Sequence, residues 1–210
     1  ILWSEIRRAY QRHKAEFGGQ CDILQLKLTE TARAYGFTAR NYDSNSFQGK
    51  HAERMLLIQD EACGITQEID DGFESCLTGS SNRGLRIGNP INPQTPFEKA
   101  CKRSHIRIPA WNHPNVSWAY RLDSDGIHRL PPEIKIDICD ETGAVKPQTE
   151  WPPEYPRDVI PGAVSVGWIE KARLRGENSA FWLSRVEGLF PVDSGASIVP
   201  QSWFLAARAR

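Results

Sequence analysis

The chain has 210 residues, of which 40% are hydrophobic and 25% charged, and its 26 basic and 26 acidic side chains give a formal net charge of zero. This is the composition of an ordinary globular protein, and it excludes a disordered, fibrous or membrane-embedded chain. No apolar run approaches the roughly 20 residues that span a bilayer. Neutrality removes the simplest argument for a nucleic-acid partner, so DNA binding requires a local basic patch. The five cysteines are widely spaced without a Cys-x-x-Cys pair, which predicts reduced thiols in a cytosolic setting.

The first forty residues predict one helix and two strands. Apolar residues at helical spacing indicate an amphipathic helix that ends at Gly18-Gly19. Strands are expected over residues 23–28 and 34–39. The chain begins at Ile1 without an initiator Met, and residues 203–210 are typical of the first turns of another helix. We therefore expect an excerpt of a longer protein.

A βαβ unit is predicted in the middle of the chain. The continuous apolar run of residues 55–58 is typical of a strand buried on both faces of a parallel sheet. A helix is expected over residues 65–77, and a second strand over residues 85–87. The stretch from Asp60 to Asn89 has the length of one βαβ unit, roughly 30 residues. The sequence therefore predicts the α/β class.

Composition changes after about residue 110, where prolines and tryptophans become frequent and strand-like alternation begins. Asp123-Ser124-Asp125-Gly126 is typical of a hairpin turn, and it lacks the third ligand and the final Glu of a calcium loop. We expect a hairpin formed by residues 117–122 and 127–130, followed by an alternating strand over residues 134–138. A proline-rich connection is expected over residues 147–161, and two helices over residues 166–176 and 179–187.

The adjacent acids Asp60 and Glu61 are the strongest candidates for chemistry. They follow a strand at its carboxyl end, where open parallel sheets bind ligands. In nucleotide hydrolysis one acid holds magnesium and a second orients or deprotonates the attacking water. The alternative is that the pair only opens a helix, where acids complement the helix dipole.

Asn89 follows the next strand and favours the catalytic reading. Its amide is expected at the same sheet edge, close to a γ-phosphate or an attacking water; Gly88-Asn89-Pro90 is otherwise simply a turn. A phosphate-binding loop needs Gly, four residues, then Gly-Lys-Ser/Thr. Gly49-Lys50-His51 fails that pattern, since position 44 is Ser and the stretch precedes a strand.

Other charged groups have weaker claims. Asp137, on the expected strand, and Asp140-Glu141, in a turn, do not indicate a two-metal nuclease centre. Two basic stretches suit DNA phosphates, but such charges are more often a solvated face. They comprise Lys102, Arg103, His105 and Arg107 in the first, and Lys171, Arg173 and Arg175 in the second.

Three motifs, in this order, resemble the large terminase subunits of tailed phages, and the likeness runs through most of the chain. The first, from Phe47-Gln48-Gly49-Lys50-His51 to Asp60-Glu61-Ala62, is similar to the family's Walker B segment. The second, with Ile87-Gly88-Asn89-Pro90, resembles the motif that couples hydrolysis to movement. The third is Ser184-Arg185-Val186-Glu187-Gly188-Leu189-Phe190-Pro191, followed by Ile198-Val199-Pro200, and resembles the junction between ATPase and nuclease domains.

The resemblance implies a partial P-loop NTPase-type parallel sheet flanked by helices, with a mixed α+β lid or linker part. Residues 1–110 would be the later part of the ATPase core, and residues 111–210 a lid or linker with a β-rich insertion over about 117–156. Asp60 would bind Mg²⁺ and thereby ATP, Glu61 would activate water and Asn89 would sense the γ-phosphate. Arg54 is a possible arginine finger for a neighbouring subunit.

In the complete protein this implies an ATP hydrolase in the host cytoplasm that drives double-stranded DNA into a procapsid. Its partners would be DNA, the portal protein, the small terminase subunit and further copies in a ring, with no membrane. The Walker A loop and the nuclease domain of the family are missing from the sequence, so this polypeptide alone is expected to be inactive. The alternative is a non-catalytic fragment that binds DNA or the portal through its basic, Trp-rich second half.

Overall fold

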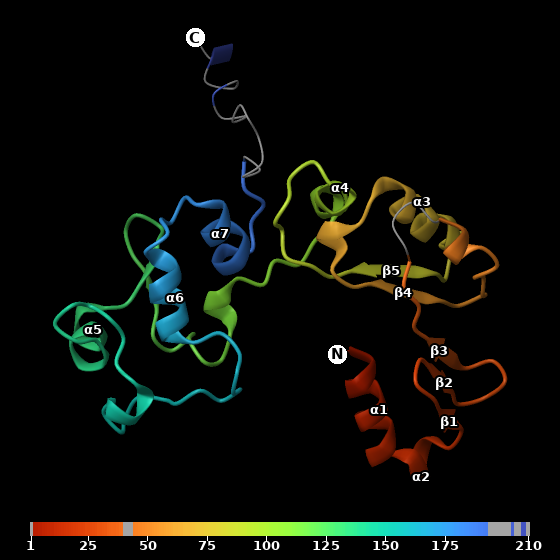
Figure 1. Ribbon diagram of the computed structural model, residues 1–210, viewed down its shortest axis with the longest axis horizontal. Helices are drawn as coiled ribbons and strands as arrows, with labels where there is room; N and C mark the ends of the chain where they lie inside the picture. The colour runs from red at the N-terminus through yellow and green to blue at the C-terminus, as the bar shows by residue number, and fades with distance from the viewer. Residues whose placement is uncertain (1, 40–43, 193–202, 204–206, 209–210) are drawn as a thin grey trace.

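The computed structural model describes residues 2–39, 44–192, 203 and 207–208, and these form a mixed α/β structure with a small parallel sheet. Figure 1 shows an N-terminal region, a sheet region with α3 and α4 above it, and a helical region around α5 to α7. The described α-helices are α1 (Leu2–Arg12), α2 (Lys14–Phe17), α3 (Gln67–Cys76), α4 (Pro96–Arg103), α5 (Pro132–Ile138), α6 (Val166–Arg173) and α7 (Ala180–Trp182). The expected helix over 203–210 falls mostly outside the described residues, as does Ile198-Val199-Pro200.

The N-terminal region pairs the two helices with an antiparallel meander, β1 (Gln20–Cys21), β2 (Gln25–Lys27) and β3 (Arg33–Tyr35). The single predicted helix is divided at His13 into these two helices, and it ends as expected at Gly18, where φ becomes +62°. The buried Tyr10 hydroxyl donates to the carbonyl oxygens of Gly18 and Gly19 at 3.1 and 2.9 Å. A Cβ on Gly19 would lie 2.2 Å from the Lys27 carbonyl oxygen, so only glycine permits this close turn.

The predicted βαβ unit is confirmed. Strand β4 (Leu56–Gln59) runs parallel to β5 (Arg83–Arg86), and α3 connects them. One face of the pair packs on α3, because Leu57 contacts a buried cluster that includes Ile69 and Phe73. Figure 1 shows α3 lying above the two strands, on one side of the pair.

The prediction that the first strand is buried on both faces is wrong for the described residues. Leu56 and Ile58 of β4, with Leu85 and Ile87 beside them, are each 45% to 61% exposed. Parallel sheets normally carry helices on both faces, because their strands are apolar all round. The described part of the chain supplies that cover on one face only.

The second half has its own core, in which three tryptophans are buried. Its buried residues are Trp111, Val116, Ala119, Tyr120, Ile134, Ile138, Cys139, Trp151, Val166, Ile169, Ala172, Trp182 and Val186. Asn115 holds the proline-rich connection to this core, with its amide donating to the Ile160 and Val164 carbonyl oxygens at 3.0 Å each. The predicted hairpin is present as β6 (Arg121–Leu122) and β7 (His128–Arg129), and the two final helices are confirmed.

Residues 134–138 are a helix, so the strand expected there is wrong. Helix α5 begins at consecutive prolines and buries Ile134 and Ile138, which are one helical turn apart, while Ile136 is 75% exposed. The alternation that predicted a strand also fits a helix when only positions i and i+4 reach the core. Within residues 117–156 the described strands are β6 and β7 and one isolated bridge, so this insertion is not rich in strands.

In the described part of the chain, no helix combines the length and apolar character needed to cross a membrane.

Candidate functional site

The predicted site residues lie on neighbouring turns at one edge of the parallel sheet. Asp60 and Glu61 follow β4 directly, and Asn89 comes three residues after β5. The two turns are hydrogen-bonded, since the Ile87 N–H donates to the Gln59 carbonyl oxygen and the Ala62 N–H donates to the Ile87 carbonyl oxygen, each at 2.9 Å. The structure thus brings together the two segments that sequence reasoning placed at a common edge.

Gly88 allows the two turns to pack against each other. A Cβ there would lie 3.1 Å from the Ala62 nitrogen and 3.2 Å from the Cys63 nitrogen. Both distances are tighter than ordinary contact to a backbone that cannot move aside. Glycine at this position is therefore a packing requirement of the site.

Glu61 has a left-handed backbone, with φ 51° and ψ 41°. Few residues other than glycine adopt this conformation, because the Cβ then crowds the backbone. The Asp60 carboxylate accepts a hydrogen bond from the Glu61 N–H at 3.0 Å, which stabilises the turn. Both acidic side chains are exposed and form no ion pair within the described residues.

The side chains at this edge suit a magnesium ion that also binds phosphate. No group of three His, Cys, Asp or Glu side chains able to hold a metal occurs among the described residues. Mg²⁺ typically takes only one or two carboxylates from protein and fills its other positions with water and phosphate oxygens. Asp60 and Glu61 match that need, and the half-buried Asn89 side chain has no hydrogen bond in the described part of the chain.

A small apolar cluster supports the acidic turn from behind. Ala62, Cys63 and Phe97 are buried there, and Phe190 packs against them from far along the chain. The Phe97 and Phe190 rings meet edge to face at 5.7 Å between centroids. Burial raises the pKa of the Cys63 thiol, and the nearby Glu61 charge raises that pKa further. Cys63 is therefore a packing residue and not a thiolate nucleophile.

Sequence reasoning missed a buried ion network beneath the site. Arg86, the last residue of β5, donates to the Asp70 carboxylate from Nε and Nη2 at 3.0 and 2.8 Å, and to Glu74 at 2.6 Å. Its guanidinium lies over the Phe73 ring, 4.4 Å from the centroid. Burial alone would lower the pKa of Arg86, but the Glu74 and Asp70 bonds outweigh it and raise that pKa. The only signal in the sequence was an arginine between Leu85 and Ile87, in the stretch expected to be a strand.

Arg185 was also missed as a neighbour of the acidic turn. It lies in the π-helical segment Leu183–Glu187, is exposed, and has no ion pair within the described residues. Its charge lowers the pKa of Cys63, which opposes the larger effect of burial. Arg54, named above as an arginine finger, lies before β4 at the opposite edge of the sheet.

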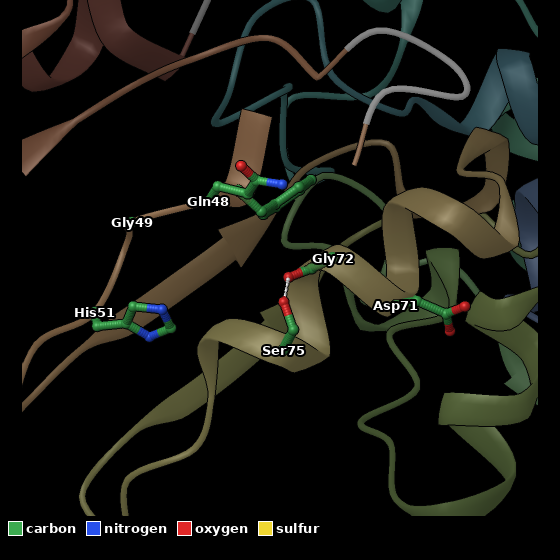
Figure 2. A pocket seen from close by; sticks show the side chains of 7 residues that line it. Gln48, Gly49, His51, Asp71, Gly72 and Ser75 are labelled. Carbon is green, nitrogen blue, oxygen red and sulfur yellow. Dashed lines mark hydrogen bonds between the residues drawn. The ribbon is translucent and has the colours of Figure 1, made fainter. Parts of the chain in front are cut away.

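Figure 2 shows a pocket of about 440 Å³ that lies elsewhere, between the loop of residues 47–51 and α3. His51, Asp71 and Ser75 line it, which are the residue types of a hydrolytic triad. However, Ser75 Oγ donates to the Gly72 carbonyl oxygen at 2.7 Å, and Asp71 accepts from Gln67 at 2.8 Å and points away from His51 (Figure 2). The three side chains are not arranged for nucleophilic catalysis.

Several side chains of the two basic stretches already form ion pairs within the chain. Lys102 pairs with Glu98 at 2.9 Å, and Arg103 reaches Glu74 at 3.5 Å. Arg173 is largely buried and bonds to Glu170, to Glu177 and to the His128 carbonyl oxygen. The role of Arg173 is structural. In the second basic stretch, only Lys171 and Arg175 then remain as candidates for binding DNA phosphates.

Comparison with known proteins gives one partial likeness. A stretch of 70 residues, 33% of the chain, is 31% identical to the probable terminase large subunit of Enterobacteria phage P7 and covers 14% of that protein's length. The chain thus aligns with about one seventh of the relative. No protein-family model and no solved structure matches the chain.

Proposed function

We propose that this chain is part of the ATPase motor of a phage DNA-packaging terminase large subunit. The observation that carries the proposal is the hydrogen-bonded pairing of the Asp60-Glu61 turn with the Gly88-Asn89 loop, at the carboxyl edge of two parallel strands. The partial likeness to a probable terminase large subunit supports it independently. In the complete protein this site hydrolyses ATP to drive double-stranded DNA into a procapsid.

Each residue at the edge has a distinct role in that reaction. Asp60 would hold the magnesium ion, which would supply positive charge to neutralise the charge that develops on the phosphates. Glu61 orients the attacking water and accepts its proton. The Asn89 amide donates to the γ-phosphate. Catalysis here is mainly positioning and electrostatic stabilisation, so small displacements of these side chains reduce the rate strongly.

On this proposal the phosphate-binding loop is supplied by another part of the complete protein. The Lys50 Nζ lies 4.5 Å from the centroid of the Phe37 ring and 5.7 Å from that of Tyr35, so this lysine is held by aromatic rings. The open face of the β4–β5 pair is the kind of surface that a larger P-loop-type core covers. On this proposal residues 1–110 are the later part of that core and residues 111–210 form the lid or linker. The partners are then DNA, the portal protein, the small terminase subunit and further copies in a ring.

The test is ATP hydrolysis by the complete gene product and by this polypeptide, measured side by side. We expect activity in the complete product only. Asp60→Ala and Glu61→Gln should each lower kcat by at least about 100-fold, the usual contribution of a positioned acid or base. Glu61→Gln should leave ATP binding intact, because the substitution removes a proton acceptor and not a phosphate contact.

Glu68→Gln is the matched control, since Glu68 is an exposed acid in the first turn of α3 and loses the same charge. Its activity should stay within about twofold of the wild type. Full hydrolysis by Glu61→Gln, or none by the complete wild-type protein, would refute the assignment. The second result would favour the alternative, a fragment that binds DNA or the portal through exposed groups such as Lys171.

A further inference from the structure

Arg86 joins β5, which leads to Asn89, to α3, which follows the Asp60-Glu61 turn, on the covered side of the sheet. Its side chain and that of Asp70 are only 12% and 10% exposed, so the pair is desolvated. Glu74 accepts from Arg86 on one side and reaches Arg103 of α4 on the other. One network therefore ties together β5, α3 and α4.

These connections bear directly on the site because of the chain order. Residues 62–66 alone link Glu61 to α3, and two of them, Ala62 and Cys63, are buried. Ile87 and Gly88 alone link Arg86 to Asn89. A shift of α3 against β5 would therefore act on both short segments, the one that follows Glu61 and the one that leads to Asn89.

We infer that Arg86 is a positioning residue, which sets the separation of the Asp60-Glu61 turn and Asn89 by clamping β5 to α3. The inference rests on the proposed function for its kinetic consequence. Arginine is suited to this task because two of its nitrogens bind one carboxylate while its flat face lies on Phe73. Lysine keeps the charge but has a single nitrogen and no flat face, so it cannot hold α3 in the same orientation.

The decisive variant is Arg86→Lys, with Arg83→Lys as matched control. Arg83 lies in the same strand at its other end, and its guanidinium donates to the Ser80 and Asn82 carbonyl oxygens at 2.8 Å each. The first measurement is amide hydrogen exchange in the 210-residue chain. Arg86→Lys should speed exchange at Ala62 and Ile87, whose N–H groups form the bonds between the two turns, by about tenfold or more over the control.

The second measurement is ATP hydrolysis by the complete protein. Arg86→Lys should lower kcat by about 10- to 100-fold while KM for ATP changes less than threefold, since misplacement affects the reacting groups more than binding. Val116→Ala, which truncates a buried side chain in the core of the second half, is the stability control. The two variants are compared at temperatures equally far below their own Tm. Glu74→Gln keeps the Asp70 bonds and should give a smaller change in the same direction.

The outcomes separate the two proposals. Unchanged exchange at Ala62 and Ile87, or a kcat equal to that of the Arg83→Lys control, overturns the positioning role. A kcat loss matched by Val116→Ala also overturns it, because the effect is then one of stability. Faster exchange in the Arg86→Lys chain, together with no ATP hydrolysis by the complete wild-type protein, supports the positioning role of Arg86 in the fold and refutes the proposed motor function.

Discussion

Glu61 occupies a backbone conformation that glycine fits best. Within the described residues, its carboxylate forms no ion pair that would offset the cost of this conformation. Holding a residue other than glycine in this region costs about 1–2 kcal/mol. Such strain is characteristic of functional sites, where the direction of a side chain matters more than stability. Here the left-handed residue follows Asp60 directly, in the turn that is hydrogen-bonded to the segment leading to Asn89.

At position 61, the residue that gives the most stable turn is expected to differ from the residue that activity requires. Glu61→Gly should be more stable than Glu61→Ala by roughly 0.5–1 kcal/mol, because glycine is unstrained where alanine keeps the Cβ. Both variants should abolish ATP hydrolysis in the complete protein. Urea unfolding of the 210-residue chain measures the difference, and equal stability of the two variants would show that the turn is not strained.

Helix α4 was not expected from the sequence, although its start carries a recognisable signal. Thr95 Oγ1 accepts from the Glu98 N–H at 3.2 Å, and Glu98 accepts in turn from the Gln94 N–H at 2.7 Å. Proline occupies the first position of the helix, where its missing N–H is not needed. The pattern Thr-Pro-x-Glu has the spacing of a capping box, and the Glu98 carboxylate accepts from the N–H of the residue before the N-cap instead of from that of the N-cap itself. This cap fixes the helix that presents Phe97 to the site.

The cap makes the stability of α4 depend on pH. Burial acts to raise the pKa of Glu98, but the bonds with Lys102 and the Gln94 N–H prevail and lower it from its usual value of 4.5. Since the folded pKa lies below the unfolded one, the stabilisation is complete above about pH 4.5 and is lost as the pH falls through the folded value. Glu98→Gln should therefore reduce the free energy of unfolding at pH 7 by about 0.2–0.5 kcal/mol, because glutamine keeps an acceptor for the Gln94 N–H but loses the charge paired with Lys102.

Urea unfolding of the wild type and Glu98→Gln at pH 7 and pH 3 measures this effect. The difference between the two proteins should shrink as the pH falls through the lowered pKa of the folded Glu98 carboxyl. Glu68→Gln, without a cap or an ion pair among the described residues, should show a smaller and flatter difference. A Glu98→Gln difference that is constant across this range would contradict the ionic cap.

At the scale of the whole molecule, Phe190 connects the second half back to the sheet region. It packs against Phe97 and the turn behind Glu61, while Trp111 of the second core donates to Glu187 at 3.3 Å. Gly188, which lies between Glu187 and Phe190 in the sequence, is close to Arg107 and Ile108. The segment of residues 187–190 therefore joins the two cores.

Loss of the Phe190 ring should loosen this joint without unfolding either core. Phe190→Ala removes the edge-to-face contact and should destabilise the protein by about 2–3 kcal/mol, less than truncation of a fully buried phenylalanine. Limited proteolysis should then cut faster near residues 104–108, which are exposed. Phe181→Ala, a partly buried ring in the other core, is the control. Equal cleavage in both variants would show that Phe190 is not the joint.

The sequence by itself determined the βαβ order, the carboxyl-edge position of Asp60, Glu61 and Asn89, and the hairpin. These features follow from local signals, because the period of apolar residues and the length of a connection are written in neighbouring residues. The packing role of Gly88 does not belong with them, since it depends on how the two turns lie against each other in the fold.

Only the tertiary structure decided the rest. Residues 134–138 became a helix because Ile134 and Ile138 meet a core built from distant tryptophans, and local alternation carries no information on that core. The bare face of the sheet depends on which elements pack there, not on the apolarity of β4. Arg86 and Asp70 are 16 residues apart, and their pairing exists only once α3 lies against β5. Partner choice of this kind is set by packing in three dimensions, because burial makes an unpaired charge costly.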